Sequence, residues 1–416
     1  MPIHNRHRIS DRVHIPHEET KGLAHGVKLL AWARTVRWAG WGFGESLLPL
    51  FIFAFSASYA EAGLLTSIYS IALLVALPIV GMLADRMSAK VLILAGLALY
   101  PLVGLGYFLA GAAGVALFVV LARLINGVSW ALESVGIDTY YRRVTDRTLL
   151  ASSFGYIETV AYAGWILAAL ISMLLVTIVP VHYLLLLILP FSLLAIPIAL
   201  MAPKDTPRPV VNPLKTFESY KSALTEWGTW DMRLKLLGVL VLFMGVIDTL
   251  TGLFIPIDAY MEGANFQMVV VLAIVATIPR LFGFMLGKLA DHHNKYKLVM
   301  WGLLGVAVLM SALAFFPGYA VLLIVSFLLC VLMELFTVIG KALVTTLGPE
   351  DHYGVRGSTF QSIATMGNLV APLLIGISLD VLGFGALVSI LAVIAVAIGL
   401  AFGMLAIRRS PTSQGS

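Results

Sequence analysis

The sequence predicts an all-α integral membrane protein built from two six-helix bundles, related by a pseudo-two-fold axis along the membrane normal. Three observations lead to this fold class. The 416 residues are 60% hydrophobic and 12% charged, with a mean hydropathy of +0.96, whereas soluble domains carry about 25% charged residues. Apolar runs of membrane-spanning length recur along the chain. A short charged turn occurs twice, as GMLADR at residues 81–86 and GKLADH at residues 287–292.

The first 28 residues are polar and are expected to form a cytoplasmic tail. The tail contains His4, His7, His14, His17 and His25. A metal site is one interpretation, but a flexible solvated tail explains these histidines better, and we expect neither a metal nor a cofactor. The apolar segment that follows is long and lacks a small-residue cleavage site. It therefore predicts a permanent spanning helix rather than a cleaved signal peptide.

A bilayer core requires about 20 apolar residues per helix, which predicts about twelve spans in this chain. The expected spans are residues 29–55, 60–84, 89–111, 115–138, 152–178, 181–202, 235–258, 266–290, 295–316, 319–345, 357–381 and 385–407. The resulting units are a tail of residues 1–28, an N-terminal bundle of 29–202, a linker of 203–234, a C-terminal bundle of 235–407 and a tail of 408–416. Aromatic residues at helical spacing in the linker, including Phe217 and Trp227, predict an interfacial helix.

Lys and Arg are concentrated in the tails, the linker and alternate turns. Arg86 and Lys90 follow the second span, and Arg142 and Arg143 follow the fourth, whereas the loops on the other side contain neither Lys nor Arg. The positive-inside rule therefore places both termini in the cytoplasm of a multi-pass protein of the plasma (inner) membrane. Topology explains the net charge of +5, so we expect a lipid bilayer and no nucleic acid as partner. The single cysteine, Cys330, excludes an intramolecular disulfide.

The charged turn repeats with an offset of 206 residues, from Gly81 to Gly287. The same offset relates SSF at residues 152–154 to STF at residues 358–360. Counting the spans in order, helix 5 thus corresponds to helix 11, and the turn after helix 2 to the turn after helix 8. Two halves related by an axis along the membrane normal are a known transporter plan, with the substrate between them. Chance similarity of apolar sequence is the alternative, but charged turns are not low in complexity.

The residues of these turns resemble a known signature. GMLADRMSAK at residues 81–90 is similar to the G-x-L-A-D-R-x-G-R-K motif of the major facilitator superfamily, with Ser88 and Ala89 replacing a Gly and an Arg. GKLAD at residues 287–291 resembles the degenerate second copy of that motif, and RLING at residues 123–127 resembles the R-x-x-Q-G motif of helix 4. The resemblance covers essentially the whole chain and implies a twelve-helix transporter of the proton-coupled type.

The resemblance associates the charged turns with gating. We expect Asp85 to face the start of helix 11, where free N–H groups suit a carboxylate, and Asp291 to face the start of helix 5. Glycine in the turns permits close helix approach. The predicted gating residues are Gly81, Asp85, Arg86, Lys90, Gly287 and Asp291. The alternative is that Arg86 and Lys90 only anchor the topology.

Ionisable residues within membrane spans are costly and usually functional. The resemblance implies that helices 1, 4, 7 and 10 line a central cavity, and most of the mid-span charges lie on them. The predicted proton-coupling and cavity residues are Glu45, Arg123, Glu133, Asp248, Arg280, Glu334 and Lys341. With Glu158, acids outnumber bases, and an acid without a basic partner can exchange protons. We favour Glu45 or Asp248 as the proton carrier; the alternative is a set of satisfied internal salt bridges.

These predictions combine into a monomeric secondary active transporter that works by alternating access. We expect a proton-coupled antiporter that exports small organic molecules. Residues 164–169 and 367–376 loosely resemble a Gly-rich motif of proton-coupled exporters. Proton-linked uptake of a metabolite is one alternative, and a non-transporting membrane sensor on a transporter fold is another. The sequence shows no P-loop, HExxH or GxSxG motif, and we expect no enzymatic activity.

Overall fold

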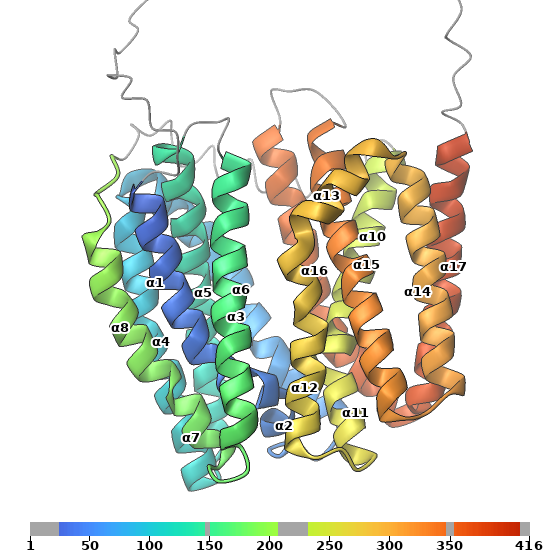
Figure 1. The fold of residues 1–416 in the computed structure, drawn as a ribbon, viewed down its shortest axis with the longest axis horizontal. Coiled ribbons are helices and arrows are strands. Elements are labelled where there is room, and N and C mark those ends of the chain that lie inside the picture. Colours follow the sequence, from blue (N-terminus) through green and yellow to red (C-terminus); the bar gives the residue numbers. More distant parts are fainter. Residues whose placement is uncertain (1–24, 146–149, 207–231, 347–352, 408–416) are drawn as a thin grey trace, which may run out of the picture.

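The computed structural model describes residues 25–145, 150–206, 232–346 and 353–407. Its helices form two groups that lie side by side, one coloured blue to green and the other yellow to red (Figure 1). The predicted all-α membrane fold class is thereby confirmed. Residues 1–24, residues 408–416 and the predicted interfacial helix of the linker lie outside those described, and α1 begins at His25, within the predicted N-terminal tail. The exact limits of the units therefore stay a prediction.

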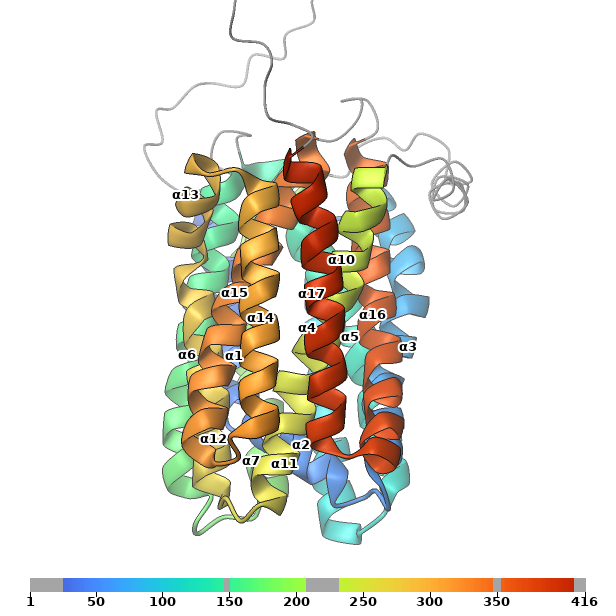
Figure 2. The same ribbon diagram turned by 90° about the vertical axis from the view of Figure 1, so that its right-hand side faces the viewer.

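The helical elements follow the predicted order along the chain. The first half comprises α1 (His25–Gly42), the 3-10 helix η1 (Glu45–Leu47), α2 (Leu48–Phe53), α3 (Tyr59–Arg86), α4 (Ala89–Ala113), α5 (Ala116–Val144), α6 (Leu150–Leu175), α7 (Val181–Leu186) and α8 (Ile188–Met201). The second half comprises α10 (Met232–Thr249), the π-helix η3 (Leu250–Phe254), α11 (Ile255–Met261), α12 (Phe266–Thr277), the 3-10 helix η4 (Ile278–Phe282), α13 (Gly283–His292), α14 (Lys295–Phe315), α15 (Tyr319–Thr346), α16 (Tyr353–Leu382) and α17 (Phe384–Ile407). Figure 2 shows α14 and α17 packed together on the outside of the second half.

Within the described part of the chain, ten helices are long and apolar enough to cross a membrane. The predicted spans 29–55 and 266–290 are not among the ten because each is interrupted. The first breaks at η1 before Pro49 in α2, and the other breaks at η4, which contains Pro279 in its first turn. Proline lacks an amide N–H and so interrupts the helical hydrogen-bond ladder. All twelve predicted segments are helical. The spans 181–202 and 235–258 also contain a break, at Leu187 between α7 and α8 and at η3, but they are among the ten.

The first helix of each half breaks at a matching position. Glu45 begins η1 in the first half, and Thr251, 206 residues later, lies in η3 of the second half. Irregular turns of this kind often mark functional sites in long helices. The matching breaks therefore agree with the internal repeat and draw attention to Glu45.

The two ends of the molecule, where turns connect the helices, differ in charge. At one end, Arg86 ends α3 and Lys90 lies in the first turn of α4, and we call this end the basic face. At the other end, the described turns contain no Lys or Arg, and we call it the base-free face. Tight turns at the base-free face use Gly114 and Gly263 in left-handed conformations, with φ of 69° and 102°. Residues with a Cβ atom rarely adopt these backbone angles, so glycine permits the short connections there.

The two halves are joined at the base-free face. The backbone N–H groups of Tyr59 and Ala60, at the start of α3, donate hydrogen bonds to the carboxylate of Asp380 near the end of α16, at 3.1 and 2.9 Å. One turn deeper, the two helices pack backbone to backbone, because a Cβ at Gly63 would collide with the carbonyl of Pro372. Asp380 thus caps a helix that belongs to the other half of the molecule.

Further contacts between the halves extend from this face toward the middle of the molecule. The Ser67 hydroxyl of α3 donates to the carbonyl of Leu369 in α16 at 2.8 Å, and the Gln267 amide of α12 donates to the carbonyl of Met173 in α6 at 3.3 Å. Toward the basic face, by contrast, a Cβ at Gly81 would have no neighbour within 4 Å. The close helix approach predicted at Gly81 is therefore absent from this conformation, which is closed at the base-free face.

Candidate functional site

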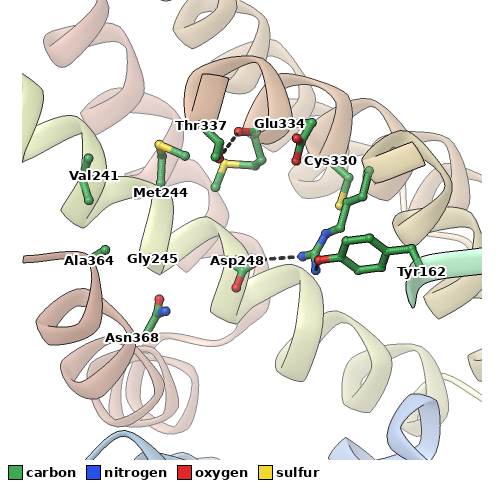
Figure 3. A pocket seen from close by; sticks show the side chains of 12 residues that line it. Tyr162, Val241, Met244, Gly245, Asp248, Cys330, Glu334, Thr337, Ala364 and Asn368 are labelled. Carbon is green, nitrogen blue, oxygen red and sulfur yellow. Dashed lines mark hydrogen bonds and ion pairs between the residues drawn. The ribbon is translucent and has the colours of Figure 1, made fainter. Parts of the chain in front are cut away.

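A cavity of about 280 Å³ lies between α6 of the first half and the inner helices of the second half. Its walls combine charged, amide, hydroxyl and sulfur-containing side chains (Figure 3). The lining residues are Tyr162, Val241, Met244, Gly245, Asp248, Arg280, Cys330, Met333, Glu334, Thr337, Ala364 and Asn368. Clefts that combine apolar walls with a few convergent polar groups are the usual form of small-molecule sites.

An ion pair occupies one wall of the cavity. The Arg280 guanidinium donates to the Asp248 carboxylate at 3.1 Å and to the Tyr162 hydroxyl at 3.2 Å, with its charge 5.5 Å from the centre of the Tyr162 ring (Figure 3). The two side chains of the ion pair remain 37% and 52% exposed. A ligand in the cavity can therefore reach both charges. Because Tyr162 belongs to the first half, this contact also joins the two halves.

Glu45 lies at the break in the first helix and differs from the other mid-span acids. Its carboxylate accepts a hydrogen bond from the indole N–H of Trp165 at 2.6 Å, and the residue is exposed although it lies deep in the bundle. Among the described residues, it forms no ion pair. An exposed carboxylate with one neutral hydrogen-bond donor can gain or lose a proton without breaking a salt bridge.

Two other mid-span acids form ion pairs inside the first half. Arg37 lies 2.8 Å from Glu133, and both side chains are at most 3% exposed. Arg34 lies 3.1 Å from Glu158. Trp38 and the other aromatic rings around the two guanidinium groups supply cation–π contacts. Glu133, predicted to line the cavity, is instead buried within the first half, where Arg37 is its partner.

The remaining predicted cavity residues are dispersed. Arg123 packs within the first half, where it donates to the carbonyl of Thr66 at 2.6 Å and lies over the ring of Tyr69 at 5.0 Å. Glu334 lines the cavity. The side chain of Lys341 falls outside those described. The structure thus brings Asp248, Arg280 and Glu334 together in one cavity but keeps Arg123 and Glu133 away from it.

The predicted gating residues lie at the basic face, where the structure describes only some of their side chains. Arg86 is exposed. The Lys90 ammonium donates to two backbone carbonyls at the end of α8, at 2.6 and 2.5 Å. A Cβ at Gly287 would lie 3.5 Å from a methyl group of Val338. The side chains of Asp85 and Asp291 fall outside those described, so their role as latches stays a prediction.

The turn between α3 and α4 is held by a residue that the sequence did not single out. Asp205, which follows α8, accepts hydrogen bonds from the Ser88 hydroxyl, the amides of Ala89 and Lys90, and Arg143 at 2.6 Å. Burial alone would raise the pKa of Asp205, but these hydrogen bonds outweigh burial and lower the pKa to about 2. The carboxylate thus caps α4. The motif of the family has an Arg at the position that Ala89 occupies in this first turn.

The sequence analysis also did not identify Tyr162 and Trp165 as candidate site residues. Both lie on α6 and contact charged groups on other elements, Arg280 in η4 and Glu45 in η1. A useful signal was available, because Glu158 and Tyr162 are four residues apart and therefore share one face of the helix. Aromatic residues are too common in membrane helices for this spacing alone to identify them.

The chain is similar to known proteins over most of its length. The sequence profile of the Major Facilitator Superfamily matches residues 30–282 and 239–416. The chain belongs to the Major Facilitator Superfamily. It is 21% identical over 350 residues to the quinolone resistance protein NorA of Staphylococcus aureus (strain MSSA476), which covers 82% of this chain and 87% of that protein. A NorA from strain MRSA252 matches at 21% over 352 residues. The predicted family resemblance is confirmed.

Solved structures of Major Facilitator Superfamily transporters share the fold. The nucleoside transporter NupG superposes with a TM-score of 0.73 at 16% identity, covering 93% of this chain and 100% of that chain. A D-xylose–proton symporter superposes with a TM-score of 0.71 at 14% identity, covering 90% and 96%. At these identities the likeness concerns the fold alone. The protein is therefore a multi-pass membrane protein of a transporter family, and a small-molecule substrate is the cargo that such a family implies.

Proposed function

We propose that the protein is a proton-coupled antiporter that exports small organic molecules by alternating access. The observation that carries the proton coupling is Glu45, an exposed mid-span carboxylate without an ion pair among the described residues. Asp248, the other preferred candidate, is held by Arg280 at 3.1 Å. We therefore favour Glu45 as the proton carrier. Protonation of Glu45 would remove a charge from a low-dielectric site and so lower the free energy of a conformation that encloses it.

The sided distribution of charge supports a membrane orientation. We assign the basic face to the cytoplasm of the plasma membrane, because Lys and Arg accumulate on the cytoplasmic side. The described conformation would then be closed toward the outside, through Asp380 and the packing of α3 against α16. Opening these contacts while Asp85 and Asp291 close the cytoplasmic side would complete the cycle of a monomer.

The direction of transport that we propose, export, is supported by the similarity to NorA rather than by any feature of the cavity. NorA is named for quinolone resistance, and a transporter can confer resistance by removing a compound from the cell. Proton-linked uptake would use the same fold, and a sensor would move nothing. These alternatives differ in the transport that they predict, so one assay separates them.

The test uses purified protein in liposomes with an imposed pH gradient. A growth screen of a deletion strain against toxic compounds, including quinolones, first identifies a transported compound. An antiporter then accumulates this compound in vesicles that are acidic inside, and an ionophore that collapses the gradient abolishes the accumulation. Accumulation only in vesicles that are acidic outside would indicate symport and import. Transport that ignores the gradient would contradict proton coupling, and no transport of any active compound would favour a sensor.

A further inference from the structure

We infer that the cavity selects small zwitterions, with Arg280 receiving the anionic group of the ligand and Asp248 its cationic group. The inference rests on the proposed function, because it names the substrate class of the transport site. It follows from the two charges of the Asp248–Arg280 ion pair, in a cavity that Glu334 also lines, and from what each charge of the pair requires when a ligand separates them.

Arg280 sets the first requirement. A guanidinium group remains charged at all physiological pH values and has donors but no acceptor. Its described partners are Asp248 at 3.1 Å and the neutral hydroxyl of Tyr162 at 3.2 Å. A ligand that displaces Asp248 from Arg280 must therefore supply another anionic group. A cation without such a group would leave the guanidinium without a counter-charge in a partly dehydrated cavity, which is costly.

Asp248 sets the second requirement. Its side chain is 52% exposed, and Arg280 is its partner in the ion pair. When a ligand takes over Arg280, the carboxylate loses its counter-charge unless the ligand also brings a cation. A zwitterion satisfies both charges at once and exchanges one ion pair for two. A simple anion or a simple cation satisfies only one of them.

The rest of the cavity limits the size and character of the ligand. At about 280 Å³, the cavity is just below the usual range of volumes for ligand pockets. Met244, Met333 and Cys330 line it beside the ion pair, and methionine side chains adapt readily to apolar groups of different shape. Asn368 and Thr337 add neutral hydrogen-bonding groups. The ligand therefore consists of a compact apolar body with two charged groups.

The test uses three probes that share one aromatic ring: 4-(aminomethyl)benzoate, benzylamine and benzoate. Affinities for the full-length protein in detergent are measured by isothermal titration calorimetry. We expect the zwitterion to bind about tenfold to a hundredfold more tightly than either simple ion, which is the range for one lost charged hydrogen bond. Benzylamine or benzoate binding as tightly as the zwitterion would overturn the inference. So would the absence of zwitterion binding at millimolar concentrations.

Variants assign the two charges. Arg280→Gln should remove the preference for the zwitterion over benzylamine, Arg280→Lys should restore part of it, and Asp248→Asn should remove the preference over benzoate. Lys297→Gln, which removes an exposed positive charge at the basic face, should leave the ranking unchanged. If Arg280→Gln keeps the full preference, Arg280 does not bind the anionic group. Binding is measured without a gradient, so a correct ranking without transport would contradict only the proposed function, and transport with a wrong ranking only this inference.

Discussion

The contact between Asp380 and the start of α3 makes a prediction about the conformational equilibrium. Two hydrogen bonds, at 3.1 and 2.9 Å, connect this carboxylate to backbone N–H groups of the other half. They can form only when the base-free face is closed. Asp380→Ala should therefore destabilise the closed conformation relative to the open one and leave the folding of each half nearly unchanged.

The magnitude follows from the cost of removing a helix cap. Replacing a capping carboxylate by alanine costs about 1 kcal/mol at an exposed position. This corresponds to about a fivefold change in the ratio of open to closed molecules. Asp380→Asn keeps one acceptor oxygen and should shift the ratio less. Gly63→Ala should shift it in the same direction and further, because its Cβ would collide with the Pro372 carbonyl in the closed form.

Distances between spin labels across the base-free face measure this equilibrium. Labels at Val115→Cys and Phe316→Cys, both exposed and in different halves, would be introduced after Cys330→Ser. We expect the long-distance population to rise about fivefold relative to the short one in Asp380→Ala. Glu262→Gln, which removes an exposed acid from the same face, is the control and should change nothing. An unchanged distance distribution in both Asp380→Ala and Gly63→Ala would refute the account of how this face closes.

Three further predictions concern the basic face and the orientation of the protein in the membrane. Asp205→Asn should lower the thermal stability of the protein at neutral pH. Because the pKa of Asp205 in the folded protein is about 2, below the ordinary value of 3.8, the stability that this carboxylate supplies should be lost as pH falls from about 4 to about 2. Melting curves from neutral pH down to about pH 2 check both points, and a variant as stable as the native protein at neutral pH would contradict them. Glu262→Cys, at an exposed position of the base-free face, should react with an impermeant maleimide in intact cells, and Lys297→Cys, at the basic face, only after permeabilisation. External labelling of Lys297→Cys would show that the assigned membrane orientation is reversed. Asp85→Asn should be produced normally but transport slowly, and native turnover in vesicles would exclude the latch.

Hydropathy identified all twelve helical segments but not where they break. Pro78 and Pro101 lie inside the continuous helices α3 and α4, whereas Pro49 and Pro279 lie at breaks. The same residue type gives both outcomes because membrane helices tolerate proline when neighbouring groups satisfy the freed carbonyl. The packing of neighbouring helices decides whether a proline breaks a helix, and this packing cannot be deduced from a single sequence.

The charged residues could be found from the sequence, but their partners could not. Arg37 and Glu133 are 96 residues apart and come from different helices, so only the packing of α1 against α5 shows that they neutralise each other. The alternative of satisfied salt bridges is therefore correct for Glu133 and Glu158. Asp248 and Arg280 were identified as candidates, but their pairing and the role of Tyr162 depend on contact between helices.

The central claim, that Glu45 carries the coupling proton, is tested most directly by comparing two kinds of transport in one variant. Glu45→Gln in liposomes should abolish accumulation driven by a pH gradient but retain gradient-free counterflow of the substrate identified by the growth screen. Asp248→Asn provides the matched comparison at the other candidate acid and should retain a response to the gradient. Full gradient-driven accumulation by Glu45→Gln would contradict the account, and loss of accumulation in Asp248→Asn alone would transfer the coupling to Asp248.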